Sequence, residues 1–165
     1  MSINLPSCAL SRRLVSVLMA ALSAVTLALN PITSPTAYAA ASPAAVSRLV
    51  GAHALYLARR EIGVPYKWGG TSPRTGFDCS GLTQWAYYRA GVHTPRTAEQ
   101  QYLATIHIPV SARRPGDLVF FFSDGSAYHV GMFVGGWTMI DAPYTGTRVQ
   151  QELIWNTSVR FGRVR

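Results

Sequence analysis

The first 39 residues of the sequence most strongly limit what the rest of the chain can fold into. Arg12 and Arg13 stand before an uncharged apolar run of sixteen residues at 14–29, and a small-residue segment follows at 37–39. A basic, an apolar and a small-residue region in this order are typical of a secretory signal peptide. A membrane anchor is the alternative, but the apolar run is short against the roughly 20 residues that span a bilayer. We therefore expect residues 1–39 to be a signal peptide that takes no part in the fold.

Removal of this segment leaves 126 residues, 40–165, which is the length of one domain. A chain of this length buries roughly two-thirds of its unfolded surface, which is enough for a hydrophobic core. The same cleavage removes Cys8 and leaves Cys79 as the only cysteine. An exported protein with one cysteine cannot form an internal disulfide, and its thiol is open to oxidation unless it is buried or used. Cys79 is therefore the first candidate for chemistry.

The charge of the chain is basic, with 15 Lys and Arg against 7 Asp and Glu and a formal net charge of +8. Nucleic acid is the usual partner suggested by such a balance. Export argues against it, and the basic residues are scattered singles and pairs such as Arg59–Arg60. An anionic extracellular polymer fits better, and simple solubility explains the charge equally well.

The first half of the predicted domain has helical patterns. Apolar residues at spacings of three and four predict an amphipathic helix over 46–62, after a frayed segment at 40–47. Glycines and prolines predict a loop over 63–78. A second helix is expected over 79–89 and a shorter one over 97–103.

The second half changes to short runs of β-branched and aromatic residues between turn signals. His107 opens one such run, and five more are the expected strands: 118–122, 129–134, 138–141, 148–151 and 159–164. Helices followed by strands predict an α+β fold, with the helices packed on one side of a mainly antiparallel sheet. No internal repeat and no second domain is indicated.

Cys79 lies in the first turn of the predicted second helix, directly after Asp78, which is a residue type that caps helices. The unpaired N–H groups and the dipole at a helix start favour a thiolate. They can also donate hydrogen bonds to the oxyanion of a tetrahedral intermediate. A buried structural cysteine is the alternative, because most free cysteines are small core residues.

A thiol nucleophile needs a histidine nearby, and the sequence has four: His53, His93, His107 and His129. His129 begins a strong predicted strand. If that strand forms a hairpin with 138–141, His129 and Asp141 lie at the same end of it, where a carboxylate can orient the imidazole. Cys79, His129 and Asp141 could instead bind zinc, although no Cys-x-x-Cys or His-x-x-x-His spacing supports a metal site.

These residues stand in five ordered sequence blocks: GVPYKWGG at 63–70, GFDCSGL at 76–82, RPGDLVFF at 114–121, HVGMFV at 129–134 and MIDAP at 139–143. The series closely resembles the NlpC/P60 family of cell-wall cysteine peptidases over residues 55–165. The resemblance implies a papain-like α+β fold with helices on a mainly antiparallel sheet of five or six strands. Residues 40–54 would then be a short N-terminal segment and helix start.

The resemblance also implies hydrolysis of a peptide bond in the stem peptides of peptidoglycan. The bond between D-glutamate and diaminopimelate is favoured over the bond between L-alanine and D-glutamate. Such an enzyme needs no cofactor and no metal. We expect a monomer that acts on peptidoglycan, binds neither nucleic acid nor membrane after signal cleavage, and is secreted, periplasmic or associated with the cell wall.

Matched residue by residue, Cys79 takes the place of the nucleophile and His129 that of the base. The third catalytic position is most often histidine in the family, and here it is Asp141. A carboxylate orients an imidazole at least as well as a histidine does, so the resemblance predicts a working variant.

The substrate-binding residues implied by the resemblance are Tyr66, which lines the site near the thiol, and Asp78 and Ser80, which flank the nucleophile. Arg96 and Thr97 lie in a segment that also looks like the family's. Two other readings stay open from the sequence: a wall-binding protein with a degenerate site, and an amidase or acyltransferase on the same Cys–His fold.

Overall fold

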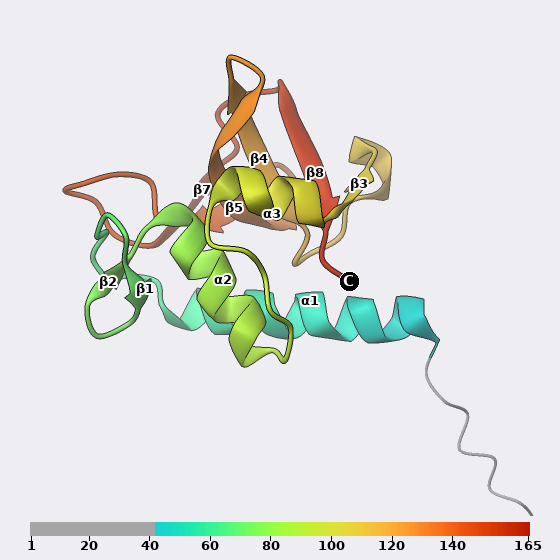
Figure 1. The fold of residues 1–165 in the computed structure, drawn as a ribbon, viewed down its shortest axis with the longest axis horizontal. Coiled ribbons are helices and arrows are strands. Elements are labelled where there is room, and N and C mark those ends of the chain that lie inside the picture. Colours follow the sequence, from blue (N-terminus) through green and yellow to red (C-terminus); the bar gives the residue numbers. More distant parts are fainter. Residues whose placement is uncertain (1–41) are drawn as a thin grey trace, which may run out of the picture. The chain divides into compact units, whose positions relative to one another are not determined.

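The computed structural model describes residues 42–165, in which three helices precede all six strands of the main sheet (Figure 1). These residues lie in one compact unit. The α+β class expected from the sequence is confirmed. The elements are α1 Pro43–Arg60, β1 Thr71–Ser72, β2 Gly76–Phe77, α2 Cys79–Arg89, α3 Ala98–Ala104, β3 Ile106–Ile108, a 3₁₀ turn Val110–Ala112, β4 Leu118–Ser123, β5 Ser126–Gly135, β6 Thr138–Asp141, β7 Gln150–Leu153 and β8 Val159–Arg163.

The main sheet has six strands in the order β3-β8-β4-β5-β6-β7, and every neighbouring pair is antiparallel. Successive side chains of a strand point to opposite faces, and the core divides accordingly. On β4, Leu118 and Phe120 join the cluster that includes residues of α1, α2 and α3. Val119 and Phe121 join a second cluster, which is formed by strand residues and the segment after β7. The helices thus cover one face of the sheet, and Figure 1 shows α3 in front of the strands.

Helix α1 begins at Pro43, three residues before the predicted start at 46. The prediction of a frayed segment was therefore wrong for residues 43–47. Ser42 caps the helix, because its hydroxyl accepts a hydrogen bond from the Ala45 N–H, and proline suits the first helical position. The predicted signal peptide, residues 1–39, lies outside the described residues. Within 42–165, none of the helices is long and apolar enough to cross a membrane.

The predicted loop over 63–78 contains a small hairpin of β1 and β2 that brings the chain to the start of α2. The carbonyl of Gly70 in this loop lies against Gly81 in the first turn of α2. A Cβ atom at Gly81 would come within 2.0 Å of the Gly70 oxygen and 2.9 Å of Oδ1 of Asp78. Only glycine at 81 therefore lets the loop close on the helix.

Gly81→Ala is expected to destabilise the protein by about 2 kcal/mol, because the backbone of the loop must move to admit the methyl group. Gly51→Ala in α1 is the matched control, since its Cβ meets no atom closer than 3.7 Å. Alanine in a helix is favoured over glycine by about 1 kcal/mol, so this control should be neutral or stabilising. Urea unfolding of the two variants measures the difference. Equal stability of both variants would contradict the close packing at Gly81.

Four strands differ from the predicted bounds. Strand β4 ends one residue later than predicted, at Ser123. Strand β5 begins at Ser126, so His129 lies inside the strand and not at its end. The pairing of β4 with β5 shifts between Phe121 and Phe122, and Tyr128 is the extra residue at this irregularity. Strand β7 lies two residues later than predicted, at Gln150–Leu153, and β8 ends one residue earlier, at Arg163.

Candidate active site

Cys79 is the first residue of α2, and its side chain is partly exposed. Asp78 caps the helix, with its Oδ1 accepting from the Gly81 N–H at 2.7 Å and its carbonyl accepting from the Leu82 N–H at 2.9 Å. Among the described residues, this leaves the N–H groups of Cys79 and Ser80 as the open donors at the helix start. The helix geometry therefore places a thiol beside donors that can stabilise negative charge.

His129 and Asp141 meet across the neighbouring strands β5 and β6. Nε2 of His129 lies 2.7 Å from Oδ2 of Asp141, and the two side chains are only 6% and 0% exposed. The hairpin expected from the sequence forms, with Met132 opposite Ile140. Because Nε2 is taken by Asp141, the imidazole is left with Nδ1 for any further partner.

The Cys79 thiol also acts on His129, because it is among the groups that raise the pKa of the imidazole. Burial on its own would lower the pKa of His129. The hydrogen bonds to Asp141 and Cys79 and their charges outweigh burial and raise the pKa to about 9. A histidine that stays charged at neutral pH is the partner that a thiolate needs.

Two aromatic side chains cover the imidazole. The ring of Phe121 on β4 lies 5.4 Å from the His129 ring, and so does the ring of Trp155 after β7. Trp155 stacks on Phe121 at 4.3 Å. They keep water from one side of the His129–Asp141 pair, which strengthens the hydrogen bond between them.

A cleft of about 360 Å³ opens at the thiol. Its lining comes from the loop before α2, the start of α2, the segment around α3 and the start of β5: Tyr66, Trp68, Gly69, Asp78, Cys79, Ser80, Arg96, Thr97, Ala98, Glu99, Ala127 and Tyr128. Tyr66 has a raised pKa, caused first by partial burial and then by the charges of Cys79 and Asp78. It therefore offers a protonated hydroxyl in the cleft.

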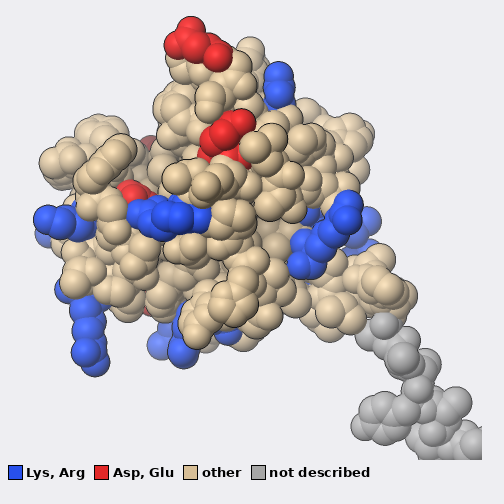
Figure 2. Space-filling view, in the orientation of Figure 1, with Lys and Arg blue, Asp and Glu red and all other residues tan. Residues whose placement is uncertain are grey.

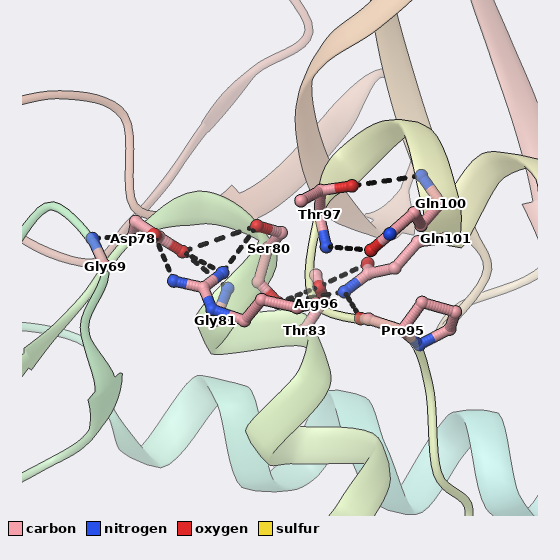
Figure 3. Close-up of polar contacts among 10 residues, drawn as sticks. All are labelled: Gly69, Asp78, Ser80, Gly81, Thr83, Pro95, Arg96, Thr97, Gln100 and Gln101. Atoms are coloured by element: carbon pink, nitrogen blue, oxygen red, sulfur yellow. Dashed lines mark hydrogen bonds and ion pairs between the residues drawn. The ribbon is translucent and has the colours of Figure 1, made fainter.

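Arg96 and the capping carboxylate of Asp78 both line this cleft, and Figure 3 shows the contacts between them. The guanidinium of Arg96 donates to both carboxylate oxygens of Asp78 and, at 2.9 Å, to the Ser80 hydroxyl. The Gly69 N–H donates to Asp78 at 2.9 Å. The Asp78 carboxylate is thus fully engaged in fixing the helix start, the loop and Arg96, and Arg96 is the partly exposed charge that faces the cleft.

Gln101 of α3 fixes the segment that holds Arg96 (Figure 3). Its buried side-chain amide donates to the carbonyls of Ser80 and Pro95, both at 2.9 Å, and accepts from the Thr83 hydroxyl at 2.7 Å. A capping box at Thr97 and Gln100 holds the beginning of α3. The sequence pointed to Arg96 and Thr97 but gave no role to Gln101, whose burial follows only from the tertiary packing.

The structure brings all six site residues from the sequence to one region. Tyr66, Asp78, Cys79 and Ser80 line the cleft, and His129 with Asp141 lies behind the thiol. The other three histidines contact neighbouring aromatic rings instead, and none lines the cleft: His53 stacks on Tyr56, His93 meets Tyr88 and His107 stacks on Tyr102.

Sequence reasoning missed several cleft and support residues. Trp68, Glu99 and Tyr128 line the cleft, and Trp155 covers His129. The side chain of Glu99 accepts from the Ala127 N–H and so ties α3 to the start of β5. Trp68 lies in the block GVPYKWGG at 63–70, so the sequence did contain a signal that could have pointed to it. The others lack any local pattern, because the fold alone brings them to the cleft.

A larger hollow of about 630 Å³ lies elsewhere, between the first turns of α1 and the end of the chain. Its lining is mostly apolar, with Arg114, Arg163 and Arg165 as its charges. It contains no nucleophile beside a base, so we place the chemistry in the smaller cleft. In residues 42–165, no three His, Cys, Asp or Glu side chains gather as a metal-binding group.

Comparison with known proteins extends these observations. Residues 63–160 match the model of the NlpC/P60 family. Bifunctional muramidase/DL-endopeptidase CwlT of Bacillus subtilis is 41% identical over 109 residues, covering 62% of this chain and 33% of the relative. Murein DD-endopeptidase MepH of Escherichia coli is 47% identical over 96 residues, covering 55% and 35%. The chain thus spans about a third of the length of these curated relatives.

A solved structure agrees with the sequence matches. The peptidoglycan hydrolase RipB from Mycobacterium tuberculosis superposes with a TM-score of 0.65 at 31% identity, covering 74% of this chain and 68% of that chain. In this fold a helix that begins with a cysteine packs against an antiparallel sheet, and one strand of the sheet contains the histidine. The chain belongs to the NlpC/P60 family.

Proposed function

We propose that this protein is a secreted peptidoglycan endopeptidase that hydrolyses a peptide bond of the wall stem peptides. The observation that supports this most directly is the line of Cys79, His129 and Asp141. The imidazole is paired with a fully buried carboxylate 2.7 Å away, and the thiol at the start of α2 is among the groups that raise the pKa of this imidazole. The names of the relatives, a muramidase/DL-endopeptidase, a murein DD-endopeptidase and a peptidoglycan hydrolase, support the substrate class.

In the proposed reaction the Cys79 thiolate attacks the carbonyl carbon of the scissile bond. The oxyanion accepts hydrogen bonds from N–H groups at the start of α2, where Cys79 and Ser80 have open donors. The His129 imidazolium donates its proton to the amine, which leaves as the C–N bond breaks. Water then attacks the thioester with His129 as base, and the acid product and the thiol are released.

Tyr66, Asp78 and Ser80 remain the proposed substrate-binding residues, since all three line the cleft beside Cys79. Asp78 acts through Arg96 and the helix cap, because its own oxygens are engaged. Arg96 faces the cleft and suits a carboxylate of the substrate. The bond between D-glutamate and diaminopimelate is the proposed site of cleavage, ahead of the bond between L-alanine and D-glutamate.

The proposed site of action is outside the cytoplasm, in the periplasm or at the wall. The Lys and Arg side chains on the face in Figure 2 form separate groups and no continuous patch. This distribution suits loose attraction to an anionic wall polymer more than tight binding of nucleic acid.

Mass analysis of products from defined muropeptides tests this proposal. The purified protein should release one new amine and one new carboxylate per bond cleaved, with masses that identify the bond. Protein pretreated with iodoacetamide should give no product, because alkylation removes the nucleophile. Loss of an N-acetylmuramyl–L-alanine linkage would instead indicate an amidase, and a product heavier than the substrates would indicate acyl transfer. Binding to peptidoglycan with no product would support the wall-binding alternative.

A further inference from the structure

Asp141 has a second carboxylate oxygen that the contact with His129 does not use. Its Oδ2 lies against Nε2 of His129, whereas Oδ1 is buried and has no hydrogen-bond partner in the described part of the chain. The whole side chain is 0% exposed. A buried carboxylate oxygen without a donor is costly, so this atom requires an explanation.

Glu152 of β7 also has a buried carboxylate oxygen without a hydrogen-bond partner among the described residues. Asp141 stands opposite Gln150, and Met139 stands opposite Glu152, so these four side chains lie on one face of the β6–β7 pair. Oε2 of Glu152 accepts from the Gln150 amide at 2.8 Å. Its Oε1 is the buried oxygen without a partner among residues 42–165. Asp141 and Glu152 are diagonal neighbours on this face of the β6–β7 pair, a position from which long side chains can meet.

Two neighbouring carboxylates whose facing oxygens are buried cannot both be ionised without strong repulsion. A single proton between them removes the repulsion, leaves the pair with one negative charge and satisfies both open oxygens. The pKa of Glu152 is raised to about 7, first by burial and then by the charge of Asp141 and the hydrogen bond to it. The neighbouring groups that act on it in the opposite direction are Gln150 and His129. Glu152 is therefore the partner that holds the proton.

We propose that Glu152 is a positioning residue that donates a proton-mediated hydrogen bond to Asp141 and so holds the ionised Asp141 carboxylate on His129. The order of contacts is then Cys79, His129, Asp141 and Glu152. Because the donor is on Glu152, Asp141 stays ionised in a site that excludes water. This inference rests on the proposed role of Cys79 and His129 as the reacting pair.

Three variants on β7 test this role. Glu152→Gln keeps a donor for Asp141, Glu152→Ala removes it, and Gln151→Ala is the control, since Gln151 is exposed and lies on the opposite face of the strand. All three are made in residues 40–165, where Cys79 is the only cysteine. The readout is the rate of Cys79 alkylation by iodoacetamide between about pH 5 and 10, which needs no wall peptide.

Without the hydrogen bond from residue 152, Asp141 should take up a proton in acid. His129 would then lose the charged carboxylate that holds it. Glu152→Ala should therefore alkylate about tenfold more slowly near pH 6, whereas Glu152→Gln and Gln151→Ala should stay within about twofold of the parent. The parent should show an ionisation near pH 7 in its rate profile, and Glu152→Gln should lack it. Equal rates for Glu152→Ala and Gln151→Ala would overturn the proposal.

Carbon-13 NMR of the glutamate carboxyls in the parent gives a reading that does not depend on any variant folding. Titration of Glu152 near pH 7 supports the shared proton, and titration near its ordinary value of 4.5 overturns it. Failure of the proposed hydrolysis can be told apart from failure of the inference about Glu152. In that case wall peptides stay intact, while the alkylation rates and the carboxyl titration still report on Glu152.

Discussion

Replacement of Cys79 by serine is expected to lower the rate of wall-peptide hydrolysis by about ten-thousandfold. A serine hydroxyl does not ionise near neutral pH, so it cannot form the anion that His129 stabilises. The variant also loses one of the interactions that raise the pKa of His129. Amine release from defined muropeptides measures the loss, and the melting temperature checks that the fold is kept.

Ser158→Ala, at an exposed position, is the control and should leave the rate unchanged. Cys79→Ser should still bind insoluble peptidoglycan, because the cleft and its charges remain. If this variant kept a rate within about tenfold of the parent, the proposed nucleophile would be wrong.

Replacement of Asp141 is expected to have the second largest effect. Asp141→Leu removes the acceptor from Nε2 of His129 and should lower the rate by about a thousandfold. Asp141→Asn keeps an acceptor but removes the charge, so its rate should fall only about tenfold. The graded loss separates the orientation of the imidazole from the stabilisation of its charge.

The same pair predicts a shift in pH dependence. With a pKa of about 9, His129 keeps its proton for the leaving amine through neutral pH, so activity should fall as pH rises through about 9. In Asp141→Asn this alkaline limit should move to lower pH, because one of the causes of the raised pKa is lost. Asp124→Asn, at an exposed turn, is the control. An unchanged limit in Asp141→Asn would contradict the role of Asp141.

The raised pKa of His129 also affects stability. In the unfolded chain the imidazole has its ordinary pKa of about 6.5, and in the folded protein about 9. Its contribution to the free energy of unfolding is therefore complete below about pH 6.5 and is lost as pH rises through about 9. Urea unfolding across this range should show this decrease in the parent and less of it in Asp141→Asn.

The elements that place Cys79 could be predicted from local sequence. Asp78 is a strong N-cap and Gly91 follows the helix end, so the predicted helix over 79–89 has the same bounds as α2. The hairpin of β5 and β6 was equally local, because two glycines separate strands of clear β pattern. Both features depend on neighbours within a few residues, which a single sequence displays.

Other parts of the site depend on contacts between distant segments. The pairing irregularity beside His129 depends on how β4 meets β5, so the sequence placed His129 at a strand end. The predicted strand over 148–151 ended just before Glu152, which excluded this residue from consideration. Its contact with Asp141 follows from the β6–β7 register, which no local pattern specifies. Gln101 and Trp155 likewise acquire their partners only through the packing of α3 and of the segment after β7.

The pKa of His129, measured by nitrogen-15 NMR of the imidazole in the purified protein, tests the central claim most directly. The claim is that a buried carboxylate holds this imidazole in its charged form against the Cys79 thiol. Titration with a pKa of about 9, lowered in Asp141→Asn, is the predicted result. A pKa at or below the ordinary value of about 6.5, unchanged in Asp141→Asn, would contradict the account.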